Sequence, residues 1–401
     1  MVRRVLAWGL VGLVVLGYFV GLGFRLAQSP SRQARLARAT APTAPWLSIR
    51  VVGNHFVNQN GEAIRLLGVN RPGMDAILPN GQCLTTQSFA PPRAMARWHI
   101  NALRLPLNED CWLGINGVTR ATAAAYRAGV KEYVVALNAS GIYSILDLHR
   151  TAPGSIPATQ FQVMPDEDHS PAFWSSVATT FVSHPAVIFD LYNEPQLSPT
   201  SALDWACWLN GCTVDRVDIG NVEYPGQETT LPMTWHAAGM QQLVNAVRRT
   251  GARQPIMVEG LNYANDLSRS SKGPISWLSY EPVDPLGQLA ASVHVYPGDS
   301  CVTEGCWKDQ YAAVAQKVPV VTGELGEADC TATFIEQYMQ FADAFSISYL
   351  AWEWTPQRNC IAGTGDYGLI TNFSGTPTPL GAAFKAHLAS LSAVSRSERQ
   401  A

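Results

Sequence analysis

Two glutamates follow apolar runs of the sequence and could act as a catalytic pair. Glu194, in an Asn-Glu-Pro tripeptide, follows the run 186–192, and Glu324 follows the run 319–323. Cleavage of a glycosidic bond with retention of configuration needs two carboxyl groups, one to protonate the leaving oxygen and one to attack the anomeric carbon. We therefore expect the pair to lie roughly 5–5.5 Å apart. Glu194 should be protonated through a raised pKa, and Glu324 should be ionised through a low pKa.

Polar and aromatic side chains also stand at the ends of most other apolar runs. Those that could bind a sugar or position the glutamates are Arg104, His149, Asn193, His294, Tyr296 and Trp352. Such a complete set is hard to explain by packing, because buried polar groups cost free energy unless they are paired. Alternation along a strand predicts that Trp354, which receives no role, faces the same side as Trp352. It predicts the same for His294 and Tyr296.

Two alternatives to this assignment arise from neighbouring acidic residues. Glu327 is the nearest competitor of Glu324, but it lies beyond the apolar run and is expected to be solvated. Asp147 and His149 together would be a candidate metal pair. No further cluster of metal-ligand residues is apparent in the sequence, and the paired glutamates need neither a metal nor a cofactor.

Eight runs of the sequence are typical of β-strands. They are 66–70, 100–106, 142–149, 187–194, 255–259, 291–296, 319–324 and 348–354. They are apolar and alternate with helical stretches such as 119–140, 171–182 and 233–250, which indicates parallel strands buried on both faces. The sequence therefore predicts an α/β fold, a (β/α)8 TIM barrel, whose active site lies at the carboxyl ends of its strands. The rival is an open doubly wound sheet, but no Gly-x-Gly-x-x-Gly follows the first strand.

Several features are expected around the barrel. Asn60-Gly61 between short apolar runs predicts an N-terminal β-hairpin. The segments 151–170 and 210–231 exceed the usual connection length and are expected to be functional loops at the rim. The aromatic residues that could stack on sugars, or belong to the core, are Trp112, Phe161, Trp208, Trp277 and Trp307.

The composition indicates one large folded domain. The chain has 401 residues, of which 47% are hydrophobic and 15% charged, with a net charge of −3. These values exclude a disordered chain and a basic nucleic-acid-binding protein. The length fits one α/β barrel, which commonly has roughly 250 residues or more, preceded by an N-terminal extension.

The N-terminal segment Val5–Phe24 is apolar and uncharged. Its 20 residues match the length needed to cross about 30 Å of hydrocarbon, which predicts an uncleaved transmembrane anchor. A cleaved or lipid-modified signal, which would make the protein secreted, is the alternative. The predicted organisation is 1–4 cytoplasmic, 5–24 anchor, 25–45 juxtamembrane linker, 46–390 barrel and 391–401 polar tail.

The orientation of the anchor is predicted differently by two signals. Four arginines within 25–38, against Arg3 and Arg4 before the anchor, favour a cytoplasmic barrel. The eight cysteines, even in number and all after the anchor, favour an oxidising compartment. We place the barrel on the extracytoplasmic side of the cell membrane.

The spacing of the cysteines suggests how they pair. Two pairs share one short spacing and are expected to form local disulfides, and elimination leaves two further pairs among the 105 connectivities that eight cysteines permit. The pairs are Cys207–Cys212, Cys301–Cys306, Cys83–Cys111 and Cys330–Cys360. Free thiols are the alternative.

Taken in order, the motifs resemble glycoside hydrolase family 5, the cellulase-like members of the clan A retaining glycosidases. The resemblance covers about residues 48–390. It rests on Leu67-Gly68-Val69-Asn70, Leu103-Arg104-Leu105-Pro106, Asp147-Leu148-His149, Asp190-Leu191-Tyr192-Asn193-Glu194-Pro195, His294-Val295-Tyr296, Gly323-Glu324-Leu325-Gly326 and Trp352-Glu353-Trp354. The order and spacing of these motifs are specific for the family and not for a substrate.

The resemblance implies a role for each candidate residue. Glu194 would be the acid/base, and Glu324 would be the nucleophile. For the others it implies that Arg104 keeps the nucleophile ionised, Asn193 binds the sugar 2-hydroxyl, His149 and His294 bond the sugar or the acid/base, Tyr296 hydrogen-bonds the nucleophile, and Trp352 stacks under the sugar.

The expected protein is a membrane-anchored retaining β-glycosidase of the endo-β-glucanase type. Its expected partners are a β-linked oligo- or polysaccharide and the membrane, with no nucleic acid and no cofactor. The alternatives are a cell-surface transglycosylase and a hydrolase of glycolipids of the glycosylceramide type. A sugar-binding barrel without turnover is disfavoured, because both glutamates are present. Specificity is expected to depend on rim loops such as 151–170.

Overall fold

The computed structural model describes residues 46–78, 81–83, 90–220, 229–268, 276–329, 331–357 and 367–398. The predicted anchor Val5–Phe24 and the linker 25–45 lie outside these ranges. Among the residues described, no helix is both long enough and apolar enough to cross a membrane.

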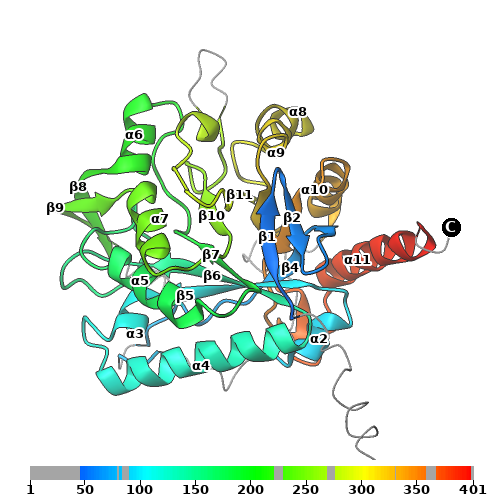
Figure 1. Cartoon of the computed structure of the whole chain (residues 1–401), viewed down its shortest axis with the longest axis horizontal. Helices are drawn as coiled ribbons and strands as arrows, with labels where there is room; N and C mark the ends of the chain where they lie inside the picture. Colours follow the sequence, from blue (N-terminus) through cyan, green and yellow to red (C-terminus); the bar gives the residue numbers. More distant parts are fainter. Residues whose placement is uncertain are drawn as a thin grey trace, which may run out of the picture. The chain divides into compact units, whose positions relative to one another are not determined.

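Eight parallel strands close into a barrel (Figure 1). In ring order they are β4 (Leu67–Asn70), β5 (Ala102–Asn108), β6 (Tyr143–Arg150), β7 (Val187–Asp190), β10 (Ile256–Glu259), β11 (Leu289–Val295), β12 (Val320–Leu325) and β13 (Ser348–Ala351). All neighbouring pairs are parallel, and the pairing of β13 with β4 closes the ring. The predicted barrel is confirmed, and the open sheet is excluded.

Helices surround the strands. Those described are α2 (Pro92–Ala96), α3 (Glu109–Leu113), α4 (Arg120–Ala139), α5 (Ser170–Phe181), α6 (Ala202–Asn210), α7 (Met240–Arg249), α8 (Glu304–Trp307), α9 (Ala313–Ala315), α10 (Thr333–Ala344) and α11 (Pro379–Glu398), with the 3-10 helix η2 (Trp277–Ser279) and the π-helical turn η3 (Lys308–Ala312). The expected helices 119–140 and 171–182 are confirmed as α4 and α5. At the start of α4, the Thr119 side chain accepts a hydrogen bond from the Thr122 N–H, as a helix cap does.

A small antiparallel sheet packs on the amino end of the barrel. It consists of β1 (Ile49–Val52), β2 (His55–Asn58) and β3 (Ala63–Ile64). Its buried residues Ile49, Val51 and Phe56 belong to one apolar cluster with barrel residues such as Ile145 and Met257. The predicted N-terminal hairpin is confirmed, and it seals the end of the barrel opposite the expected active site.

The segment before α7 differs from the prediction. β8 (Gly211–Ile219) and β9 (Thr229–Ala238) form an antiparallel hairpin, so much of the expected loop 210–231 is a β-ribbon (Figure 1). The expected helix 233–250 is wrong at its start, since α7 begins at Met240. Trp235 and Ala237 are buried while Thr234 and His236 are exposed, which is the period of two of a strand.

The C-terminal region completes the domain. A short pair of strands, β14 (Ile370–Asn372) and β15 (Thr376–Pro377), precedes α11. Because α11 runs to Glu398, the described part of the expected tail 391–401 is helical.

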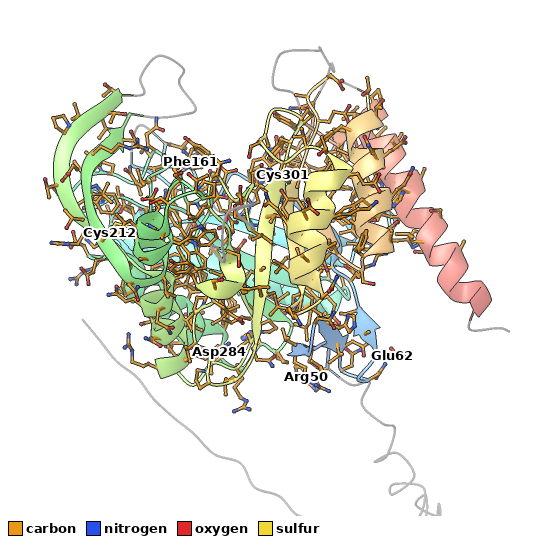
Figure 2. All side chains as sticks on the ribbon, turned by 90° about the horizontal axis from the view of Figure 1, so that it is seen from above. Arg50, Glu62, Phe161, Cys212, Asp284 and Cys301 are labelled. Atoms are coloured by element: carbon orange, nitrogen blue, oxygen red, sulfur yellow. A yellow bond between two sulfur atoms is a disulfide. The ribbon has the colours of Figure 1, made fainter. Side chains whose placement is uncertain are left out.

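Three disulfides are present among the described residues. Cα–Cα distances are 5.8 Å for Cys83–Cys111, 5.0 Å for Cys207–Cys212 and 5.5 Å for Cys301–Cys306, which confirms these predicted pairs. Cys330 and Cys360 lie outside the described residues. All three bridges lie in segments that follow barrel strands, and Figure 2 labels Cys212 and Cys301 on two of them. They therefore hold loops at the carboxyl face.

Candidate active site

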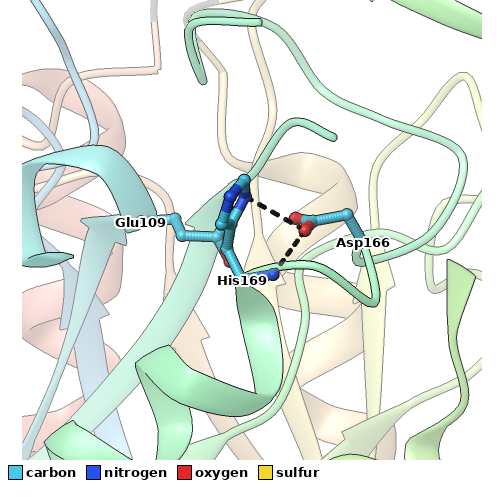
Figure 3. A group of neighbouring side chains, drawn as sticks. All are labelled: Glu109, Asp166 and His169. Atoms are coloured by element: carbon cyan, nitrogen blue, oxygen red, sulfur yellow. Dashed lines mark hydrogen bonds and ion pairs between the residues drawn. The ribbon is translucent and has the colours of Figure 1, made fainter. Parts of the chain in front are cut away.

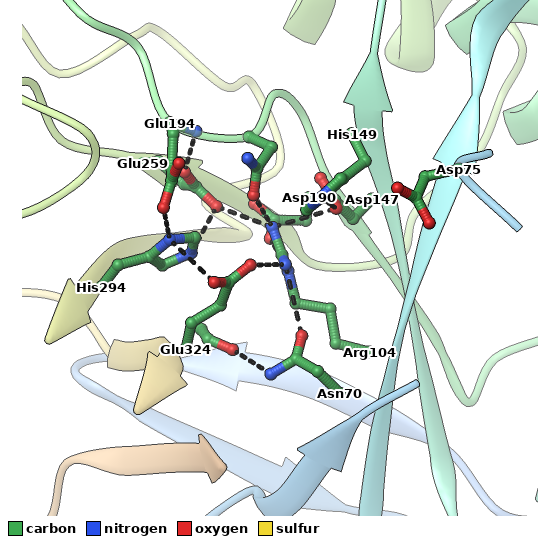
Figure 4. Close-up of polar contacts among 12 residues, drawn as sticks. Asn70, Asp75, Arg104, Asp147, His149, Asp190, Glu194, Glu259, His294 and Glu324 are labelled. Carbon is green, nitrogen blue, oxygen red and sulfur yellow. Dashed lines mark hydrogen bonds and ion pairs between the residues drawn. The ribbon is translucent and has the colours of Figure 1, made fainter. Parts of the chain in front are cut away.

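Arg104 is the centre of a buried ionic cluster at the carboxyl ends of the strands (Figure 4). Its Nε lies 2.8 Å from Asp190, and its Nη2 lies 2.9 Å from Glu259 and 3.1 Å from Asp147. Its Nη1 lies 2.7 Å from Oε1 of Glu324. The planar guanidinium, with five N–H donors in a fixed fork, is suited to hold several acceptors at once.

The cluster combines one cation with four carboxyl groups away from water. Burial lowers the pKa of Arg104, but its carboxylate partners outweigh burial and raise the pKa well above its usual value. Burial raises the pKa of Asp147 and of Asp190 well above the usual range, more than Arg104 lowers it. Burial also raises the pKa of Glu259, yet His294 and Arg104 outweigh it and lower the pKa below its ordinary value. Glu259 is therefore the most readily ionised of these three.

Three of these carboxylates are also close enough to share a metal ion. Oxygens of Asp147, Asp190 and Glu259 lie within 4.8 Å of one another. Arg104 contacts all three, so it already supplies a positive charge to this group.

The predicted pair Glu194 and Glu324 meets at His294. Nδ1 of His294 lies 2.9 Å from Oε1 of Glu194 and 3.6 Å from Oε2 of Glu324. One oxygen of each glutamate lies within 4.8 Å of the other. This separation matches the short distance of retaining glycosidases, since inverting enzymes place their carboxyl groups roughly 6.5–9.5 Å apart.

Both oxygens of Glu324 are held by neighbours. Arg104 binds Oε1, and Tyr296 Oη donates a 2.6 Å hydrogen bond to Oε2. Two glycines of the Gly-Glu-Leu-Gly motif make room for these neighbours. A Cβ on Gly323 would lie 3.1 Å from Nε2 of His294, and a Cβ on Gly326 would lie 2.5 Å from the Tyr296 ring. The motif therefore shapes the space around Glu324.

The pKa of Glu324 differs from expectation. Burial raises the pKa of Glu324 above its ordinary value and outweighs the lowering by His294 and Arg104. The predicted low pKa of Glu324 is wrong, because the spacing of residues does not report how completely this carboxyl group is removed from water. Burial lowers the pKa of His294, but Glu259 and the two facing glutamates raise it well above its usual value. His294 is thus a second cation beside Glu324.

Glu194 lies in a turn of unusual backbone conformation. Its φ is 57°, in the left-handed region that few residues other than glycine adopt. The Glu194 N–H donates a 2.6 Å hydrogen bond to Oε2 of Glu259, which holds this turn in place. β7 consequently ends at Asp190 and does not continue to Glu194 as predicted. The Glu194 side chain retains 21% exposure.

A cavity of about 820 Å³ opens over the two glutamates. His149, Asn193 and Trp352 line it, as do Phe161 and Tyr367. The Trp352 and His149 rings are nearly parallel, with centroids 5.9 Å apart. Burial lowers the pKa of His149 to about 4, so this ring is neutral near pH 7. The buried Nδ2 of Asn193 has no hydrogen-bond partner in the part of the chain that the structure describes, which leaves it free for a ligand.

The structure brings all eight predicted site residues together and separates two tryptophans. Trp352 lines the cavity, whereas Trp354 is fully buried against Trp98, with ring centroids 4.8 Å apart. The predicted alternation fails here because β13 ends at Ala351. Among the other aromatic candidates Phe161 reaches the cavity, and the four fully buried ones belong to the core: Trp112, Trp208, Trp277 and Trp307.

Sequence reasoning did not select three acidic residues of this region. For Asp190 the available signal was alternation, because it stands two positions after the inward-facing Ile188. For Glu259 the signal was its position at the end of the run 255–259. Glu327, expected in solvent, is only 2% exposed. Its Oε2 accepts hydrogen bonds from the backbone N–H groups of Phe334 and Ile335 at the start of α10.

A second acidic cluster supports the loop 151–170 (Figure 3). Ligand atoms of Glu109, Asp166 and His169 lie within 4.8 Å of one another. Ser170 and Thr151 donate hydrogen bonds to Glu109 at 2.7 and 2.6 Å, which ties the loop to α3. Burial raises the pKa of Glu109 well above its usual value, so a shared proton explains how two carboxyl groups lie together here.

Comparison with known proteins agrees with this geometry. The family model described as Cellulase (glycosyl hydrolase family 5) matches residues 57–358, about three quarters of the chain. The chain belongs to glycosyl hydrolase family 5. It is therefore a glycoside hydrolase.

Individual relatives of this family 5 chain are distant. Endoglucanase MaCel5A of Microbulbifer sp. (strain ALW1) is 24% identical over 155 residues, which span 39% of this chain and 27% of that relative's length. The β-glucanase SdGluc5_26A from Saccharophagus degradans has a similar fold, with a TM-score of 0.59 and 21% identity over 86% of this chain and 94% of its own. The endocellulase of the archaeon Pyrococcus horikoshii gives a TM-score of 0.59 and 18% identity over 86% and 98%.

Proposed function

We propose that the protein is a retaining endo-β-glucanase that hydrolyses a β-linked glucan, with Glu324 as nucleophile and Glu194 as acid/base. The observation that carries this proposal is the pair of glutamates, within 4.8 Å of each other on an open cavity of about 820 Å³. A cavity open to solvent favours an internal bond of a long chain. The β-glucanase SdGluc5_26A has been solved with cellotetraose bound, which supports a glucan over other β-linked chains.

The proposed reaction is a double displacement. A Glu324 oxygen bonds to the anomeric carbon while the glycosidic bond breaks and Glu194 gives its proton to the departing oxygen. The product is a glycosyl ester on Glu324 and a released sugar alcohol. Glu194, now a carboxylate, then takes a proton from water as that water attacks the same carbon and frees Glu324.

The surrounding charges fit the two steps. Arg104 and Tyr296 hold one oxygen each of Glu324, so the carboxylate is oriented before the sugar arrives. The His294 imidazolium lies 2.9 Å from Glu194, where it stabilises the carboxylate that forms when Glu194 has lost its proton. The free Nδ2 of Asn193 is placed to donate to a sugar hydroxyl.

The first test is Glu324→Gln, made in a chain produced under oxidising conditions. We expect the wild type to cleave a β-glucan, and NMR of the first product should give the β-anomer. The variant should lose turnover by at least about 10³-fold while its circular dichroism is unchanged, because it lacks the attacking carboxylate. Near-wild-type turnover would refute the assignment, and products longer than the substrate would indicate a transglycosylase.

Glu194→Ala separates the acid from the nucleophile. Loss of general acid catalysis should cost about 10²–10⁴-fold on a glucan, whose leaving oxygen needs a proton. It should cost far less on an aryl glycoside with a good leaving group. Equal losses on both substrates would contradict the assignment of Glu194.

We further propose that Val5–Phe24 anchors the enzyme in the cell membrane with the barrel outside. Its support is the length and uncharged composition of this segment, together with the three disulfides of the barrel. The full chain should remain with membranes after carbonate extraction and should be open to protease added outside the cells. Recovery of a shortened chain in the medium would instead indicate a cleaved signal.

A further inference from the structure

A second pocket adjoins the catalytic cavity on the side of the β8–β9 hairpin. It has a volume of about 470 Å³, and its walls include Gln160, Phe161, Arg216 and Tyr263. We call it the hairpin pocket. Phe161 lines both this pocket and the cavity over the glutamates, so the two spaces adjoin at its ring. In Figure 2, Phe161 is labelled between Cys212 of the hairpin and Cys301 of the loop after β11.

Hydrogen bonds join the walls of the hairpin pocket to one another. Gln162 exchanges two hydrogen bonds with the Asp218 backbone, at 2.7 and 3.0 Å, which fixes the loop 151–170 against β8. Arg216 donates a 2.8 Å hydrogen bond to Gln196, two residues after Glu194. The pocket is therefore constructed from three segments whose relative positions are set by side-chain to backbone and side-chain to side-chain bonds.

The hairpin pocket lies on the side of Glu194. The Tyr263 N–H donates a 3.0 Å hydrogen bond to the carbonyl of Pro195, the residue that follows Glu194. A general acid stands beside the oxygen that leaves, so the part of a substrate that departs lies on the side of the acid. A chain that continues from the cleaved bond in this direction reaches Phe161 and Tyr263.

The side chains of the pocket fit a neutral sugar. Tyr263 is 51% exposed, and its aromatic ring offers a flat apolar face for the C–H face of a sugar ring. The Phe161 ring beside it is held by the Arg150 guanidinium, which lies 4.6 Å from the ring centroid. Gln160 is 95% buried (5% exposed), and its Nε2 has no hydrogen-bond partner among the residues described, so a donor lies unused in the wall. Arg216 is balanced by Asp218 at 3.9 Å, which disfavours a strongly charged ligand.

We propose that the hairpin pocket is a binding subsite for the leaving-group side of a neutral β-linked glycan chain. The proposal rests on the proposed function, because it assigns the direction from Glu194 as the acid. It makes efficient cleavage depend on chain length. Long chains reach the pocket, whereas a short activated glycoside ends at the catalytic cavity.

The test compares two substrates on Tyr263→Ala, with Tyr263→Phe as the matched variant that keeps the ring. On cellohexaose, Tyr263→Ala should lower kcat/KM about tenfold, and Tyr263→Phe should restore most of it. On an aryl β-cellobioside, both variants should stay within about twofold of the wild type, since this substrate does not extend into the pocket. Phe345→Ala, a partly exposed aromatic that lines neither cavity, should change neither value.

Each outcome separates the two proposals. An unchanged kcat/KM on cellohexaose, or an equal loss on both substrates, would overturn the subsite while the proposed function stands. A wild type that cleaves no β-glucan, these two substrates included, would overturn both. A selective loss on the long chain, with altered positions of cleavage in end-labelled cellohexaose, would establish the subsite.

Discussion

The two ends of the barrel interior are made by the same strands and have opposite chemistry. Near the amino end, Ile145, Ile188 and Met257 belong to an apolar layer that the N-terminal sheet covers. Two residues further along the same strands stand Asp147, Asp190 and Glu259, which surround Arg104. Residues two apart on a strand face the same side. The two positions therefore both face the barrel interior, the first in the apolar layer and the second in the ionic layer.

The apolar layer and the ionic layer contribute differently to stability and to catalysis. Burial of an aliphatic side chain stabilises a protein by about 1.5–3 kcal/mol, whereas a buried ion pair often gives no net stability because both charges lose water. The ionic layer nevertheless fixes Glu324 and Glu194, through Arg104 and Glu259. We infer that the apolar layer stabilises the barrel and that the ionic layer positions the catalytic pair.

Arg104→Met should have the largest effect of any change in the ionic layer. It removes the guanidinium that four carboxyl groups share and leaves only His294, beside Glu259 and Glu324, as a cation, which should cost about 3–5 kcal/mol of unfolding free energy and remove turnover. Urea denaturation and activity assays measure the two effects. The matched change in the apolar layer, Met257→Ala, should cost about 2–5 kcal/mol while the folded fraction keeps its kcat/KM. A stable, active Arg104→Met variant would refute the distinction between the layers.

His294→Gln should change the pH dependence more than the stability. Activity requires ionised Glu324, so the acid limb of the kcat/KM profile follows the pKa of that group. The His294 cation lowers the pKa of Glu324. Its removal should raise that pKa further and move the acid limb to higher pH. His184→Gln, outside both layers, should leave the limb in place, and a shift of His294→Gln to lower pH would contradict the prediction.

Ser292→Ala should have the smallest effect. Ser292 lies on β11 between Ala290 of the apolar layer and His294. Its buried Oγ has no hydrogen-bond partner among the residues that the structure describes. Removal of an unpaired buried hydroxyl should be neutral or should stabilise by up to about 1 kcal/mol. Thermal unfolding measures this change, and a clear loss of stability would indicate a partner for the hydroxyl.

The sequence predicted the parts of the molecule that depend on strand ends. The ends of apolar runs located Glu194 and Glu324, and Arg104 near the end of its run, because parallel strands bring their carboxyl ends to one face. The same signals could not distinguish Trp352, which lines the cavity, from Trp354, which is buried in the core, since the direction of each side chain depends on where β13 ends. The hairpin β8–β9 was missed because its second strand leads directly into the pattern of α7.

The electrostatics could not be predicted from spacing. The pKa of Glu324 depends on its depth of burial and on distances to His294 and Arg104. Glu259 positions the site only through tertiary contacts, since it binds both Arg104 and the Glu194 N–H. Neither the pKa of Glu324 nor the contacts of Glu259 can be predicted from the sequence pattern of a single strand.

The placement of the disulfides affects how the enzyme should be produced for study. Cys207–Cys212 joins α6 to the hairpin β8–β9, and Cys301–Cys306 lies in the loop after β11. None of the three described bridges crosses the barrel strands themselves. Protein recovered from a reducing cytosol would lack these bridges, so we expect its rim loops to be held less firmly. A substrate screen on such material would report the preferences of the reduced protein. The measured substrate specificity would therefore depend on the expression host.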